Sequence, residues 1–227
     1  MLKWFLTGLV SLGMVMPAWA LDSDQLFRVL APSVWLVRTL DRDGLPLGIG
    51  SAVVVSPKQL LSNCHVLKGA KSFLLVKEDV SFKGRLEQVD LERDMCLLAV
   101  SAPDFNAPAV ALGDSDKVQV GTRVVALGNP RALELTFSEG LVSRLEKSER
   151  TGLLDKIQTS APISPGSSGG GLFDAEGRLI GITQSALIQA GSQNLNFALP
   201  INWLKDLPAR SAEQLAAYYA EQAKLRK

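Results

Sequence analysis

Residues 164–171 read Ser-Pro-Gly-Ser-Ser-Gly-Gly-Gly, and this stretch narrows the choice of fold more than any other part of the chain. Glycines let a backbone turn sharply and approach a ligand closely, so such a segment can aim a hydroxyl outward beside N–H groups. That arrangement suits a nucleophilic serine, with Ser168 as the candidate. A Gly/Ser-rich surface turn has the same composition, so the segment alone leaves both interpretations open.

The spacing Gly166-x-Ser168-x-Gly170 also fits the nucleophile turn of α/β-hydrolases, a fold that includes esterases. In that fold the serine comes first along the chain, followed by the acid and then the histidine. His65 is the only histidine of this sequence, and it precedes Ser168. The α/β-hydrolase interpretation therefore fails, and the order of the residues is that of the chymotrypsin class.

The acid has to be chosen among fourteen Asp and Glu residues between His65 and Ser168. A carboxylate that orients a histidine lies partly buried beneath the imidazole. Asp94 directly precedes residues 95–100 (MCLLAV), an unbroken apolar run typical of a buried strand. Asp90 is the nearest competitor, so the residues by themselves favour Asp94 and leave Asp90 open.

Short apolar runs separated by turn residues fill most of the chain, which predicts an all-β fold. Their spacing leaves no room for regular crossover helices, so a parallel sheet is not expected. The chain divides into two halves, at about residues 33–110 and 111–200. We expect a short helix over residues 22–30 before them. A C-terminal helix is expected over residues 208–227, with Ser211 and Gln214 as its capping box.

The first twenty residues have the pattern of a secretory signal peptide. Lys3 is followed by a mostly apolar stretch at residues 4–15 and by the small-x-small site Ala18-Trp19-Ala20. We expect cleavage after Ala20, export to the periplasm or the medium, and no stable membrane insertion afterwards; an uncleaved N-terminal anchor is the alternative. Without Lys3, 24 − 1 = 23 basic residues face 23 acidic ones, so charge gives no indication of nucleic-acid binding.

The single histidine also bears on metal binding. It excludes a two-histidine zinc site within one chain, and the two cysteines do not form a CxxC pair, so we expect neither a metal nor another cofactor. Cys64 precedes His65, and Cys96 follows Asp94 by two residues. Contact between His65 and Asp94 would therefore bring the cysteines close, and both a disulfide and two buried thiols remain open.

Three segments resemble the HtrA/DegP-type trypsin-like serine proteases. Residues 60–67 (LLSNCHVL), 93–100 (RDMCLLAV) and 158–170 (QTSAPISPGSSGG) resemble the histidine, aspartate and serine motifs of that family. Further similar stretches follow the family's order at residues 111–115, 120–121, 126–130, 139–143 and 196–200. The resemblance covers about residues 24–207, nearly the whole mature chain.

The resemblance implies a trypsin-like protease domain at residues 21–207, built of two six-stranded antiparallel β-barrels with the active site between them. It implies that His65, Asp94 and Ser168 form the catalytic triad of a serine endopeptidase that acts on polypeptides. The chain ends soon after this domain, so we expect none of the PDZ modules that many relatives carry. A homo-oligomer stays open. The alternative is a catalytically silent protease fold that only binds polypeptides.

The resemblance also implies substrate contacts. The N–H groups of Gly166 and Ser168, with Ser167 as a further candidate, would form the oxyanion hole. The primary specificity pocket would be lined by Pro162, Ile163 and Ser164, and the strand Asn196-Phe197-Ala198 would pair with the substrate backbone. Ser167 stands where pancreatic relatives have an aspartate, so their N-terminal activation switch is not expected here. No anionic residue lies near the expected pocket, which favours a small or aliphatic residue before the scissile bond.

Overall fold

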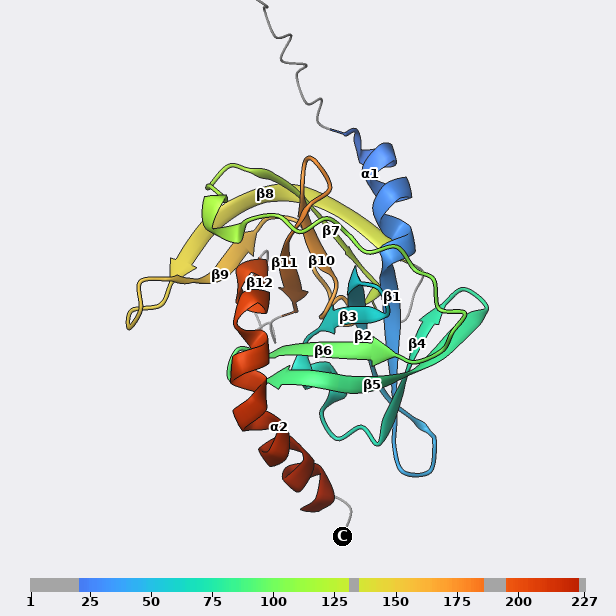
Figure 1. Ribbon diagram of the computed structural model, residues 1–227. Coiled ribbons are helices and arrows are strands. Elements are labelled where there is room, and N and C mark those ends of the chain that lie inside the picture. Colours follow the sequence, from blue (N-terminus) through green and yellow to red (C-terminus); the bar gives the residue numbers. More distant parts are fainter. Residues whose placement is uncertain (1–20, 131–134, 186–194, 225–227) are drawn as a thin grey trace, which may run out of the picture.

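The structure is a computed structural model that describes residues 21–130, 135–185 and 195–224. The expected signal peptide at residues 1–20 lies outside the described residues. Two closed six-stranded antiparallel barrels pack side by side, with one helix at each end of the described chain (Figure 1). The predicted all-β fold of two barrels is thereby confirmed.

The first barrel has the strand order β1-β2-β3-β6-β5-β4, and the second has the order β10-β11-β12-β9-β8-β7. The strands of the first are β1 (Val34–Leu40), β2 (Pro46–Ser56), β3 (Gln59–Ser62), β4 (Ser72–Lys77), β5 (Val80–Asp90) and β6 (Met95–Val100). Those of the second are β7 (Arg123–Gly128), β8 (Thr136–Lys147), β9 (Leu154–Thr159), β10 (Gly171–Asp174), β11 (Leu179–Gln184) and β12 (Asn196–Pro200). The helices are α1 (Ser23–Leu30) and α2 (Leu207–Lys224).

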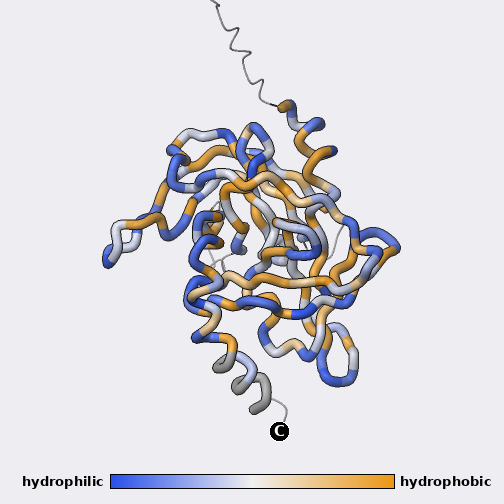
Figure 2. Tube along the Cα trace, in the orientation of Figure 1, coloured by the Kyte–Doolittle hydropathy of each residue, from blue (hydrophilic) through white to orange (hydrophobic). Residues whose placement is uncertain are grey.

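The unbroken apolar run of β6 is explained by burial on both faces of the strand. Met95 and Leu97 point into a core that lies between the barrels, whereas Cys96, Leu98 and Val100 point into the first barrel. Alternate residues of a strand face opposite sides, so a strand at the contact of two barrels has no polar face. Figure 2 shows the same apolar colouring along the strands at the centre of the molecule.

The second barrel meets the same core with alternate residues of β7. Val125 and Leu127 contact the core between the barrels, while Val124 and Ala126 face the interior of the second barrel.

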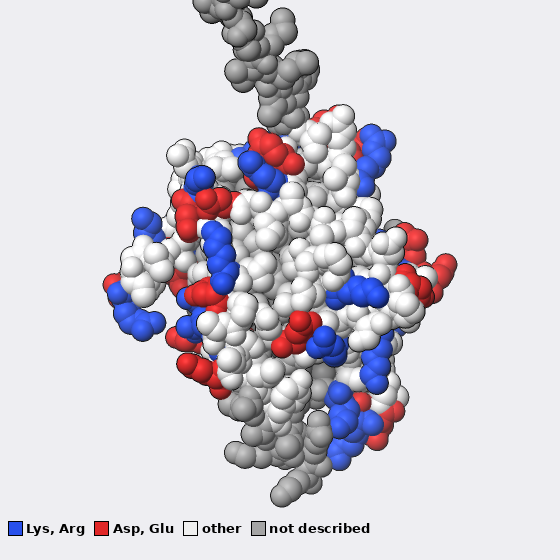
Figure 3. All heavy atoms as spheres, in the orientation of Figure 1, with Lys and Arg blue, Asp and Glu red and all other residues white. Residues whose placement is uncertain are grey.

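Lys, Arg, Asp and Glu are interspersed over the face seen in Figure 3. Among the described helices, none is long and apolar enough to cross a bilayer.

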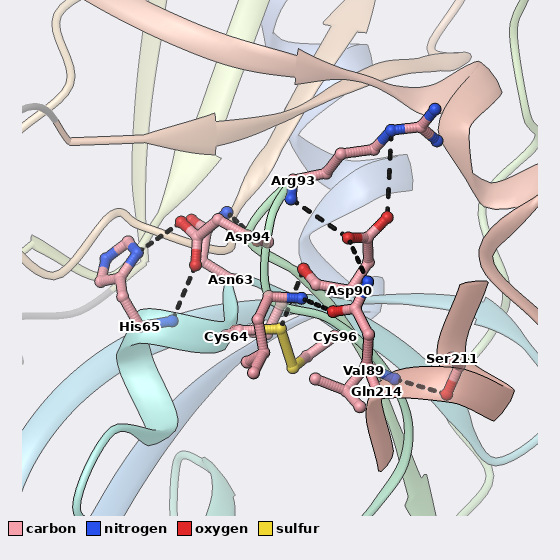
Figure 4. Close-up of a disulfide and its surroundings, with 12 residues drawn as sticks. Asn63, Cys64, His65, Val89, Asp90, Arg93, Asp94, Cys96, Ser211 and Gln214 are labelled. Atoms are coloured by element: carbon pink, nitrogen blue, oxygen red, sulfur yellow. Dashed lines mark hydrogen bonds and ion pairs between the residues drawn. A yellow bond between two sulfur atoms is a disulfide. The ribbon is translucent and has the colours of Figure 1, made fainter. Parts of the chain in front are cut away.

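Helix α2 starts earlier than the sequence indicates, so the expected capping box is wrong. The helix begins at Leu207, which places Ser211 and Gln214 inside it. Their side chains accept hydrogen bonds from the backbone N–H groups of Val89 and Leu91, at 2.9 and 2.7 Å. These contacts attach α2 to the end of β5 (Figure 4).

Asp90 anchors the same helix through its carboxylate, which is almost fully buried. Arg210 donates to both carboxylate oxygens, and Gln214 and the Arg93 N–H donate as well. Burial alone would raise the pKa of Asp90, but the hydrogen bonds from Arg210, Arg93 and Gln214 outweigh it and hold the pKa below its ordinary value. The ionised form of Asp90 therefore stabilises the fold.

Replacing Arg210 tests this anchor. In Arg210→Ala we expect the free energy of unfolding to fall by about 3 kcal/mol at neutral pH, because a buried carboxylate loses its ion partner. Stability from the depressed pKa of Asp90 is present above the ordinary value of 3.8 and is lost as the pH falls through the lowered folded-state value. The difference between parent and variant should therefore narrow from about pH 7 to about pH 3 in urea unfolding.

The matched control is Arg28→Ala, which removes an arginine from an exposed ion pair with Asp24. Its loss should stay below about 1 kcal/mol at either pH. Equal losses in the two variants would contradict the anchoring role of Arg210.

Candidate active site

His65 and Asp94 lie in direct contact at the rim of the first barrel. His65 is on the short 3-10 helix η2 (Cys64–Leu67) that follows β3, and Asp94 ends the turn before β6. Strands β3 and β6 are paired, with Ser62 opposite Cys96, so the two segments emerge side by side. Asp94 Oδ2 lies 2.6 Å from His65 Nδ1, and Asp94 Oδ1 accepts the His65 backbone N–H at 2.8 Å (Figure 4).

The backbone of Asp94 has the left-handed conformation, with φ of +56°. Non-glycine residues rarely adopt it, and it persists only where the surroundings hold it. Here the Asp94 carbonyl accepts hydrogen bonds from Cys64 N at 3.3 Å and from Asn63 Nδ2 at 3.1 Å. The residues that flank the histidine thus fix the backbone of the residue that orients it.

Gln184, at the end of β11 in the second barrel, completes the surroundings of this carboxylate. Its Nε2 donates to Asp94 Oδ2 at 2.8 Å. The Asp94 side chain therefore accepts hydrogen bonds from both barrels. Gln184 could not be recognised from the sequence, because a polar residue at the end of a strand has no distinguishing signal until the register of the barrels is known.

Asp90, the other candidate for the acid, does not contact His65. Its carboxylate turns away from His65 toward Arg93 in Figure 4, and it is bonded by Arg210 of α2. Of the two candidates, Asp94 is the one that reaches the imidazole.

Ser168 lies on the turn between β9 and β10, which approaches both barrels closely. Its hydroxyl oxygen is 2.8 Å from Ser185 Oγ and accepts the Ser185 backbone N–H at 3.1 Å. Within the described part of the chain, no hydrogen bond joins Ser168 Oγ to His65. Hydrogen bonds between catalytic groups are often unformed in ligand-free structures. Here the Ser168 hydroxyl is bonded to Ser185, directly after β11, instead of to His65.

Steric contact with the first barrel explains why the residue after Ser168 is a glycine. Gly169 has a φ of +87°, and a Cβ there would lie 2.0 Å from the carbonyl oxygen of Ser51 in β2. Only glycine satisfies both constraints. The glycine-rich composition is thus explained by a turn that is wedged against the first barrel.

The N–H groups of this turn are not equivalent. Ser167 N donates to Ser164 O at 2.9 Å, so it is already used within the turn. The expectation that Ser167 supplies an oxyanion donor is therefore wrong for this arrangement. Gly166 N and Ser168 N remain the candidates.

A small cavity of about 90 Å³ lies beside the turn. The three residues expected at the pocket, Pro162, Ile163 and Ser164, all line it, and no charged residue is among its described walls. Its remaining lining comes from Ala126, Leu127, Gly128, Pro130, Thr136, Ser138, Ser167 and Thr183.

A larger cavity of about 720 Å³ lies next to Asp94 and Gln184, which both line it. It runs between the β8–β9 turn and the start of α2, with Leu153, Leu154 and Trp203 among its apolar walls. Its size is in the range of roughly 300–1,000 Å³ that is usual for ligand sites.

The expected role of residues 196–198 in pairing with a substrate is wrong. These residues begin β12, and β12 is hydrogen-bonded to β11 on one side and to β9 on the other. A strand paired on both sides has no free edge for an added peptide strand. Asn196 instead supports the cavity wall, because its Oδ1 accepts the backbone N–H of Ile163 at 3.0 Å.

Cys64 and Cys96 form a disulfide, with their Cα atoms 5.0 Å apart. Both residues are buried. The bond joins the segment that carries His65 to the strand that follows Asp94, so it restrains the pair covalently. Of the two alternatives left open by the sequence, the structure has the bridge.

The disulfide should contribute measurably to stability. The bridge closes a loop over 32 positions, for which loss of chain entropy predicts a contribution of about 3–4 kcal/mol. We expect the free energy of unfolding, measured in urea, to fall by that amount when a thiol reductant cleaves the bond during unfolding. The Cys64→Ser/Cys96→Ser variant should be less stable by a similar amount. It should not respond to the reductant, and an equal response in parent and variant would contradict the assignment.

Comparison with known sequences gives a family. The family model described as trypsin-like peptidase domain matches residues 50–182. The putative serine protease HhoB of Synechocystis sp. is 38% identical over 161 residues, which are 68% of this chain and 38% of that protein. The periplasmic pH-dependent serine endoprotease DegQ of Escherichia coli is 37% identical over 166 residues, which are 70% of this chain and 36% of that protein. The chain thus spans less than half the length of these curated relatives.

Solved structures agree with this result. The HtrA-type protease AlgW with a tripeptide has a TM-score of 0.71 and 33% identity, over 80% of this chain and 60% of that chain. The same protease with a decapeptide has a TM-score of 0.73 and 28% identity, over 84% and 67% of the two chains. The chain therefore belongs to the trypsin-like peptidase family, and its relatives there are HtrA-type serine proteases.

Proposed function

We propose that this chain is an exported serine endopeptidase that hydrolyses peptide bonds in unfolded or extended polypeptides. The observation that carries the proposal is the double contact of Asp94 with His65, at the side chain and the backbone, beside a serine on a tightly packed glycine turn. A protein that only binds polypeptides has no need of these three residues together. The relatives of this chain include a periplasmic endoprotease and an HtrA-type protease with bound peptides, and their names support both the proposed peptidase activity and the proposed export.

In the proposed mechanism, Ser168 Oγ attacks the carbonyl carbon of the scissile peptide bond. His65 takes the proton of the hydroxyl and gives it to the leaving amine, so an acyl-enzyme remains, which water then hydrolyses. Asp94 holds the imidazole by its Nδ1 and stabilises the imidazolium. The N–H groups of Gly166 and Ser168 would stabilise the oxyanion, and loss of one such donor typically costs about 3 kcal/mol of transition-state stabilisation.

Ser168 has to leave its contact with Ser185 in this mechanism. Rotation of the side chain would exchange the hydrogen bonds to Ser185 for one to the unbonded nitrogen of His65. The imidazole is accessible for it, since 44% of the His65 side chain is exposed.

The two cavities fit an extended polypeptide that lies across the cleft. The small cavity would take the side chain before the scissile bond, and the larger one would accept residues further along the same chain. Pairing with β12 is not available. The segment of Gln184 and Ser185, where β11 ends next to Ser168, is the proposed place for backbone contacts with the substrate.

Covalent labelling tests the triad. The chain lacking residues 1–20 should react once with a fluorophosphonate, as measured by intact mass, because the reagent modifies only an activated serine. Ser168→Ala and His65→Ala should not be labelled. Asp94→Asn should lower the rate of peptide hydrolysis by roughly 10⁴-fold, because the imidazole loses its orienting acceptor.

Asp90→Asn is the comparison for Asp94→Asn, because both remove one negative charge from the same segment. It should keep the labelling rate within a few-fold of the parent at a temperature where both are folded. A parent that is folded by circular dichroism and yet is never labelled would overturn the proposed activity in favour of a binding-only protein.

The walls of the small cavity predict the residue before the scissile bond. A peptide library should give cleavage after small or aliphatic residues such as Ala and Val, because a volume of about 90 Å³ without a charged wall favours neither long nor cationic side chains. Products would be identified by mass spectrometry. Strict cleavage after Arg or Lys would contradict the prediction.

A further inference from the structure

Ser51 lies in strand β2 of the first barrel and is fully buried. Its backbone and its side chain form hydrogen bonds with four other residues, two of them on the turn that carries the candidate serine. Its backbone N–H donates to Ser168 O at 2.7 Å, and its carbonyl accepts from Ser62 Oγ at 2.8 Å. Its hydroxyl lies 2.9 Å from Gly166 O and also contacts Asn129. One residue of the first barrel thus reaches two carbonyls of the turn that carries Ser168.

The direction of the hydroxyl bond is determined by Asn129. Both Asn129 N and Asn129 Nδ2 donate to Ser51 Oγ, at 2.8 and 3.3 Å. A hydroxyl has one proton to donate and two lone pairs to accept with. With two donors already directed at Ser51 Oγ, its own proton goes to Gly166 O.

A second buried hydroxyl, from the other barrel, holds the next carbonyl of the same turn. Thr183 in β11 is fully buried, and its Oγ1 donates to Ser167 O at 2.7 Å. Gly170 N donates to the same oxygen at 2.9 Å. The carbonyls of residues 166, 167 and 168 are therefore all held, the first and third by Ser51 and the second by Thr183.

These carbonyls determine where the neighbouring N–H groups point. In a planar trans peptide, the C=O of one residue and the N–H of the next point in opposite directions. Holding Ser167 O against β11 therefore turns Ser168 N away from β11. Holding Gly166 O fixes the peptide that follows Gly166, at a glycine whose φ of +97° would otherwise permit many orientations.

We propose that Ser51 and Thr183 are positioning residues for the oxyanion hole. Thr183 holds the Ser167 carbonyl so that the N–H of Ser168 points into the hole, and Ser51 holds the Gly166 and Ser168 carbonyls, which fixes the turn on both sides of that N–H. This inference rests on the proposed peptidase function. Neither side chain is a catalytic residue, because each is buried and acts through the turn. The arrangement makes the oxyanion hole a joint product of both barrels.

The test compares hydroxyl-deleting and hydroxyl-keeping variants. Ser51→Ala and Thr183→Val should each lower kcat for a peptide substrate by roughly tenfold or more, since displacements of about 1 Å at a reacting group have effects up to 10²-fold. KM should change less than twofold, because Ser51 does not line the small cavity and because valine at position 183, which does line it, has nearly the shape of threonine. Thr183→Ser keeps the hydroxyl and should recover most of the parent kcat.

Thr39→Val is the control for losing a buried hydroxyl as such. Thr39 is also buried in the first barrel, and its Oγ1 donates to a backbone carbonyl, that of Gly48, at 2.9 Å. This variant should keep the parent kcat even where its thermal unfolding temperature falls. Unfolding temperatures of all variants, measured in parallel, ensure that the rates are compared on folded protein.

The outcomes separate this inference from the function on which it rests. A parent that turns over substrate, with Ser51→Ala and Thr183→Val equally fast, overturns the positioning role and leaves the peptidase. Losses in kcat that Thr183→Ser shares with Thr183→Val also overturn it, because serine keeps the hydroxyl and should therefore keep kcat. A parent without fluorophosphonate labelling overturns the peptidase proposal, and the positioning role with it.

Discussion

The hydrogen bonds that cross between the two barrels are the constraint on which the candidate site depends. Ser51 of β2 is bonded to the turn that carries Ser168, and Gln184 of β11 is bonded to Asp94 of the first barrel. Each barrel thus holds a part of the site that the other barrel contributes. The apolar core between the barrels brings these groups together without directing them, and the polar contacts supply the direction.

The segment from Asp90 to Cys96 shows how the rest of the fold supports this contact. It is held at its start by Arg210 of α2, in its middle by His65 and Gln184 through Asp94, and at its end by the disulfide. Such multiple restraint explains how Asp94 keeps a left-handed backbone, which costs of the order of 1–3 kcal/mol where nothing opposes it. Helix α2, far from Ser168 in the chain, therefore contributes to the position of the acid.

Much of the fold and the identity of the three candidate residues could be predicted from the sequence. A single histidine and a glycine-rich serine turn are local patterns, and they can be read without knowing which strands are neighbours. The choice of Asp94 over Asp90 needed the family resemblance as well. Gln184 and Ser51 could not be found in this way, because their partners lie 90 and 115 positions away and depend on barrel register. The error at residues 196–198 has the same origin, since only the strand order shows that both edges of β12 are used.

Ser168 combines a fixed backbone with a hydroxyl that has another partner. Its own carbonyl and that of Ser167 are bonded to the two barrels, so the turn has little freedom to rearrange. The hydroxyl, in contrast, is bonded to Ser185 and not to His65. In the proposed enzyme, Ser168 Oγ therefore has to leave Ser185, whereas the backbone of the turn is already held by both barrels.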